Sequence, residues 1–85
     1  MKDNSRMILK SKVIESVRTG VRKHVVEIYQ AWASGFITKE EFECSMWDIR
    51  FTADSIVEAM GSMDVLSADD VYDLCRFIYS LTETY

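Results

Sequence analysis

Residues 37–42, which read ITKEEF, decide the fold because they contain every feature of a helix start. Thr38 can cap the exposed amide of Glu41, and the Glu41 side chain can reach back to the amide of Thr38. Ile37 can pack on Phe42 and fix the angle at which the chain enters the helix. We therefore expect a helix to begin at residue 39, directly after a turn.

A second helix start of the same kind follows at residues 66–71, which read LSADDV. Here Ser67 is the expected cap and Asp70 takes the reciprocal position. Gly35 and Gly61 each precede one of the two starts, where a glycine commonly ends the preceding helix. Two turns and three helices follow from these signals.

The apolar residues of all three regions recur at helical spacings of three and four. The predicted core positions are Leu9, Val13, Val17, Val21, Val25, Ile28 and Trp32, then Phe42, Met46, Ile49, Ala53, Ile56 and Met60, then Val71, Leu74, Ile78 and Leu81. The pattern keeps its phase across Gly20, so we expect one continuous first helix. The sequence predicts an all-α, three-helix bundle as a single domain over residues 1–85. Its helices span about 5–34, 39–60 and 68–83, and the last two form an antiparallel hairpin.

The first predicted helix is longer than its two partners. At 1.5 Å per residue the three helices measure about 45, 33 and 24 Å. The part that extends past the hairpin carries apolar side chains, namely Met7, Ile8, Leu9, Val13 and Ile14. Exposed apolar side chains are unfavourable in water, and a second copy of the chain would cover them. We therefore expect a homodimer.

The composition excludes several classes of protein. Of the 85 residues, 48% are hydrophobic and none is proline, which is typical of a globular helical domain. Two cysteines are too few for a disulfide scaffold, and one histidine excludes the repeated-histidine metal motifs. No long apolar run suggests a signal peptide or a membrane span. We therefore expect a cytoplasmic protein with no metal or cofactor and no membrane association.

The net charge of −4 is divided unevenly between the two parts of the chain. Residues 1–36 hold seven Lys and Arg against three Asp and Glu, a net +4, and residues 37–85 hold three against eleven, a net −8. The opposite net charges of the two parts can simply attract each other, within one chain or across a dimer. As an alternative, a basic first helix with Arg18, Arg22 and Lys23 can contact nucleic acid. The acidic last helix is unsuited to reading DNA.

Few residues suggest catalysis. The sequence Arg-Thr-Gly-Val-Arg-Lys-His from Arg18 to His24 resembles the loosely spaced Arg–His pair of HEPN-type ribonucleases. That resemblance implies a phosphodiester-cleaving site shared across a dimer of helical bundles, and it is a third hypothesis for the function. Cys44 and Cys75 are expected at helical interiors or their borders, where a free cysteine acts as a small hydrophobe. The sequence favours a protein that is not an enzyme.

Two helices carry a second apolar edge beside their core positions. These edges are Cys44, Trp47 and Phe51 on the second helix and Tyr72, Cys75 and Tyr79 on the third, each at spacings of three and four. The charged residues beside them are Asp48, Arg50, Asp54 and Asp73. Aromatic anchors with a charged border are typical of a protein interface, although Trp47 and Phe51 could instead complete the core.

The leading hypothesis is a small interaction protein that binds another macromolecule and inhibits or modulates it, and a protein is the partner we expect. In size and composition the chain is similar to small phage-encoded inhibitors, immunity proteins and antitoxins. The predicted partner-binding residues are Trp47, Asp48, Arg50, Phe51, Asp54, Tyr72 and Tyr79.

Overall fold

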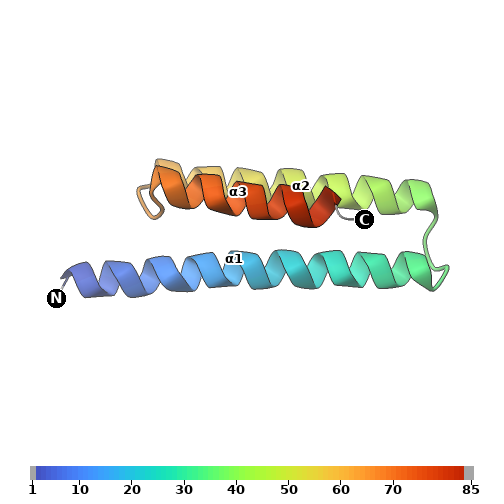
Figure 1. The fold of residues 1–85 in the computed structure, drawn as a ribbon, viewed down its shortest axis with the longest axis horizontal. Helices are drawn as coiled ribbons and strands as arrows, with labels where there is room; N and C mark the ends of the chain where they lie inside the picture. Colours follow the sequence, from blue (N-terminus) through green and yellow to red (C-terminus); the bar gives the residue numbers. More distant parts are fainter. Residues whose placement is uncertain (1, 84–85) are drawn as a thin grey trace.

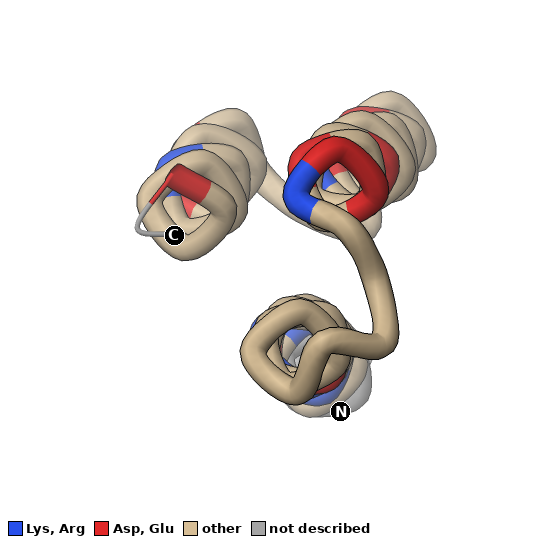
Figure 2. Tube along the Cα trace, turned by 90° about the vertical axis from the view of Figure 1, so that its right-hand side faces the viewer, with Lys and Arg blue, Asp and Glu red and all other residues tan. Residues whose placement is uncertain are grey.

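The computed structural model describes the backbone of residues 2–83 and the side chains of residues 8–83. It consists of three helices, of which each runs antiparallel to the one before it (Figure 1). They are α1 (Lys2–Ala33), α2 (Lys39–Ser62) and α3 (Ala68–Glu83). Each helix packs against the other two. Seen from the end, they occupy the corners of a triangle (Figure 2). The predicted all-α bundle with a long first helix is confirmed.

Both predicted helix starts form as expected. The Glu41 amide donates to Thr38 Oγ1 at 3.1 Å, and the Thr38 amide donates to Glu41 Oε1 at 3.0 Å. The Asp70 amide donates to Ser67 Oγ at 3.2 Å, and the Ser67 amide donates to Asp70 Oδ2 at 3.2 Å. These bonds satisfy amide groups that would otherwise lack partners in the first turn of a helix.

Only one of the two predicted helix-ending glycines ends a helix. Gly35 has φ +79°, and the amide of Phe36 donates to the carbonyl of Ala31 at 2.9 Å, as expected after a helix end. The prediction for Gly61 is wrong, because α2 continues to Ser62 and the left-handed residue of the following turn is Asp64, with φ 59°.

Gly61 has a different role, which is to let α3 approach α2. A Cβ atom at this position would lie 2.7 Å from Cγ2 of Val71, closer than two carbon atoms can pack. Gly20, by contrast, lies in the continuous helix α1 with nothing within 4 Å of a Cβ built there. The predicted continuity of the first helix across Gly20 is confirmed.

The core runs along the axis shared by the three helices. Its buried residues are Val21, Val25, Phe42, Met46, Val57, Leu66, Leu74 and Ile78. Trp32 stacks on Phe42 with ring centroids 4.6 Å apart and packs against this core. Two predicted core positions are wrong: Leu9 is 55% exposed and Ile56 is 47% exposed. Leu9 lies beyond the hairpin, and Ile56 faces a groove beside α1.

The first helix extends past the hairpin as predicted (Figure 1). The Lys10 ammonium lies 2.7 Å from the carboxylate of Asp70 in the first turn of α3, which marks the level at which the three-helix region begins. Val13 and Ile14 were expected to be uncovered, but they pack against the core because α3 already reaches their level. Ile8 and Leu9 are exposed, and the Met7 side chain lies outside the described residues.

Candidate interaction face on helices α2 and α3

The structure brings the two predicted apolar edges together along the junction of α2 and α3. Cys75 Sγ donates to Asp54 Oδ1 at 2.8 Å, and Arg50 Nε donates to Thr82 Oγ1 at 3.0 Å. These two contacts link α2 and α3, which lie side by side (Figure 2). The outward-facing residues of this junction, Trp47, Arg50, Phe51, Tyr72 and Tyr79, are called the aromatic face below.

Trp47 and Phe51 are the most prominent residues of the aromatic face. Their ring centroids lie 5.2 Å apart with an interplanar angle of 31°. The side chains remain 53% and 57% exposed, respectively. Neither belongs to the buried core or packs against it, so the alternative prediction that they complete the core is wrong.

Arg50 joins the aromatic residues of the two helices. Its guanidinium carbon lies 5.1 Å from the ring centroid of Trp47 on α2 and 5.1 Å from that of Tyr79 on α3. The half-buried Arg50 side chain is also anchored by its bond to Thr82, which is buried. A cation over two rings favours these ring positions, by about 0.5–1 kcal/mol for each exposed contact.

The α3 side of the face contains a second, similar contact. The guanidinium carbon of Arg76 lies 5.7 Å from the ring centroid of exposed Tyr72. Tyr72 and Tyr79 line one shallow depression, together with Arg76 and Cys75. The two tyrosines, two helical turns apart, therefore belong to one surface.

Cys75 and Asp54 form a structural link beneath the aromatic face. Burial, and then the hydrogen bond to the Asp54 carboxylate with its negative charge, raise the pKa of the Cys75 thiol to about 12. The thiol therefore stays protonated at neutral pH and is a poor nucleophile. The Asp54 carboxylate accepts the bond from this neutral thiol and keeps its negative charge, but it is half-buried. Of the two cysteines expected at helical interiors or their borders, Cys75 is half-buried, whereas Cys44 is exposed.

The remaining predicted border charges lie in solvent. Asp48 on α2 and Asp73 on α3 are both exposed. Exposed charges of this kind influence the encounter with a partner more than the strength of the final contact.

The three basic residues of the nucleic-acid hypothesis do not form one patch. Arg18 and Arg22 both lie over the ring of Phe77 on α3, with guanidinium carbons 5.2 and 5.6 Å from its centroid. Lys23 lies on another side of α1 and lines a groove against α2. Phe77 was not expected to contact these arginines, since no sequence spacing links residues on separate helices.

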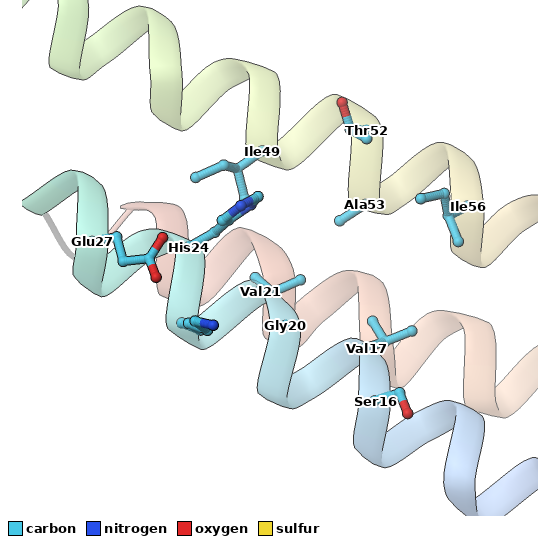
Figure 3. A pocket seen from close by; sticks show the side chains of 11 residues that line it. Ser16, Val17, Gly20, Val21, His24, Glu27, Ile49, Thr52, Ala53 and Ile56 are labelled. Carbon is cyan, nitrogen blue, oxygen red and sulfur yellow. The ribbon is translucent and has the colours of Figure 1, made fainter.

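The Arg–His pair is also separated. His24 points from α1 toward Ile49 on α2 (Figure 3), whereas Arg18 lies over Phe77 on α3. Within one chain the two side chains therefore face different grooves. Both are exposed, so neither is held in a closed pocket.

The groove between α1 and α2 was missed by the sequence analysis. It has a volume of about 420 Å³, and its apolar part is formed by Val17, Ile49, Ala53 and Ile56 (Figure 3). Gly20 leaves the groove open because it places no side chain there. The one feature of the sequence that could have indicated this groove is Gly20, a glycine inside a continuous helix.

Comparisons with protein-family models, with curated proteins and with solved structures give no match for this chain. Among the described residues, no three His, Cys, Asp or Glu side chains come together in a way that could hold a metal ion. None of the described helices has the length and apolar character needed to cross a membrane.

Proposed function

We propose that this protein is a small, non-enzymatic interaction protein whose aromatic face binds another protein and inhibits or modulates it. The observation that carries the proposal is the exposed Trp47–Phe51 pair, held beside Tyr79 by Arg50. Tryptophan, tyrosine and arginine are the residues that most often dominate the energy of protein interfaces.

The arrangement of the aromatic face suits binding for two reasons. Exposed aromatic surface is unfavourable in water, and a partner that covers it gains roughly 25 cal/mol per Å² of apolar area. The rings are also already positioned, because Arg50 lies over both Trp47 and Tyr79. Side chains ordered before binding lose less conformational entropy on binding.

The charge around the face indicates the chemistry of the partner. Residues 37–85, which form α2 and α3, carry a net charge of −8. Complementary charge speeds association, so a partner with a basic border is favoured. The nucleic-acid alternative has no comparable support, since Arg18 and Arg22 are stacked on Phe77 and Lys23 lies elsewhere.

The test compares the two tryptophans of the chain. A protein captured from the native cell is purified, and its affinity for the wild-type chain is measured by titration calorimetry. Trp47→Ala is expected to lower that affinity by about 2 kcal/mol or more, roughly thirtyfold. Its cost in folding stability should be only about 1–2 kcal/mol, because half of the side chain is already in water.

Trp32→Ala is the matched control. Trp32 stacks on Phe42 and packs against the core, so its loss should cost about 3–5 kcal/mol of folding stability. Because Trp32 lines a depression together with Trp47 and Arg50, the affinity of the remaining folded fraction should fall, but by much less than in Trp47→Ala. The proposal is wrong if Trp47→Ala binds the partner as tightly as the wild-type chain does. Salt-dependent binding of nucleic acid that is lost in Arg18→Ala would favour the alternative instead.

A further inference from the structure

The exposed side of α1 that borders the α1–α2 groove carries one continuous row of residues. They recur at helical spacings of three and four, and they are Leu9, Lys12, Ser16, Gly20, Lys23 and Glu27. All six are exposed, although Leu9 is a large apolar residue. Ser16, Gly20, Lys23 and Glu27 also line the groove, and Ile56 forms part of its far wall (Figure 3). This row is called the α1 row below.

The charges near the α1 row are complementary about the point between Thr19 and Gly20. Lys12 lies as many residues before Thr19 as Glu27 lies after Gly20. A second α1 helix placed antiparallel across this point would set each Lys12 beside the other copy's Glu27. A parallel copy would instead set Lys12 beside Lys12, so the pattern favours the antiparallel arrangement.

The centre of this pattern is also where a second helix can come closest. A side chain at Gly20 would meet nothing within 4 Å, so the backbone of α1 is open to an approaching helix there. Small residues at a crossing point allow two helices to pack closely. The row thus combines a close central contact with opposite charges at equal distances on either side.

We infer that a second copy of this chain docks on the α1 row, giving an antiparallel dimer with two-fold symmetry. A two-fold axis through the Thr19–Gly20 point makes the two contacts between Lys12 and Glu27 equivalent, as a self-complementary interface requires. Two helices paired in this way overlap from residue 9 to residue 30, a length of about 33 Å. Leu9, which extends past its own hairpin, would then lie against the end of the partner's α1. The aromatic face is on α2 and α3, so it stays free for another protein in both copies.

The test exchanges the charges of the predicted pair and measures mass by light scattering and dissociation by analytical ultracentrifugation. The wild-type chain of 9.9 kDa should give about twice that mass at micromolar concentration. Lys12→Glu alone and Glu27→Lys alone each create two like-charge contacts per dimer. Each should raise the dimer dissociation constant about tenfold or more.

An equimolar mixture of the two variants restores opposite charges at both contacts, and it should form a heterodimer with nearly the wild-type dissociation constant. Asp73→Lys is the matched control for Glu27→Lys, because it makes the same change in net charge at an exposed site on α3. It should leave the dimer intact. Far-UV circular dichroism checks that every variant remains folded.

Three outcomes would overturn the inference. The first is a wild-type chain that stays monomeric throughout the micromolar range. The second is a dimer that both single variants leave unchanged, which would place the interface on another surface. The third is a mixture that stays as weakly associated as the separate variants, which would show that Lys12 and Glu27 do not meet across the interface.

Discussion

The two helical glycines Gly20 and Gly61 should respond to the same substitution with opposite signs. Replacement of Gly20 by Ala adds a methyl group where nothing lies within 4 Å. The helix gains about 0.5–1 kcal/mol, since alanine loses less backbone entropy than glycine on folding. For a domain of this size, 1 kcal/mol corresponds to about 4–8 °C, so the melting temperature should rise by roughly 2–8 °C.

The same replacement at Gly61 should destabilise the protein. The new Cβ would lie 2.7 Å from Cγ2 of Val71, so α3 or the Val71 side chain must move. Valine has stiff χ1 preferences and cannot simply rotate away. Overpacking of this kind costs about 1–3 kcal/mol, which outweighs the gain in helix propensity. The net loss is up to about 2.5 kcal/mol.

Thermal and urea denaturation, followed by far-UV circular dichroism, measure both effects. All variants are measured at one sub-micromolar concentration, below the micromolar range in which the chain should dimerise, so that association does not contribute to the free energy of unfolding. Gly61→Ala is also made in a Val71→Ala background, where the colliding methyl group is absent. Its cost should then fall markedly. Equal stabilisation by both alanines would refute the close approach of α3 at Gly61, and destabilisation by Gly20→Ala would refute the open surface at Gly20.

Three further predictions concern single groups. In the native protein, iodoacetamide should modify exposed Cys44 much faster than Cys75 below about pH 9, as peptide mass spectrometry will show, because the pKa of Cys75 is raised to about 12. The Asp70 carboxylate accepts bonds from Lys10, first, and from Ser67, and these bonds lower its pKa from 3.8. The stability that they add to the folded protein is therefore present above pH 3.8 and is lost as the pH falls through the lowered pKa. Acid denaturation of Lys10→Met should show a smaller loss of stability than that of the wild-type chain. Ile78→Ala should cost about 2–5 kcal/mol in urea denaturation, since that side chain is fully buried.

The helices could be predicted closely from the sequence because their starts are local. In each start the capping bonds join residues three apart, such as Thr38 with Glu41 and Ser67 with Asp70. No distant part of the chain is needed to form these bonds. The all-α class also follows from local pattern, since apolar residues repeat at three and four throughout.

The candidate interaction face could be predicted only in separate parts. The spacing of Trp47 and Phe51, and that of Tyr72 and Tyr79, each indicated one apolar edge on one helix. Arg50 contacts the rings of both Trp47 and Tyr79 because of the way in which α2 and α3 are aligned along their axes. Sequence spacing within a helix contains no information on that alignment.

The sequence by itself determined where the helices begin and which residues share a face of each helix. Only the tertiary structure decided what covers each face. Gly61 is needed because α3 approaches there, and Ile56 is half exposed because Gly20 leaves the groove beside it open. Phe77 lies under Arg18 and Arg22 because α1 and α3 pack together along that side. The physical reason is that helical periodicity is set by bonds within one helix, whereas burial depends on the shape and distance of neighbouring helices.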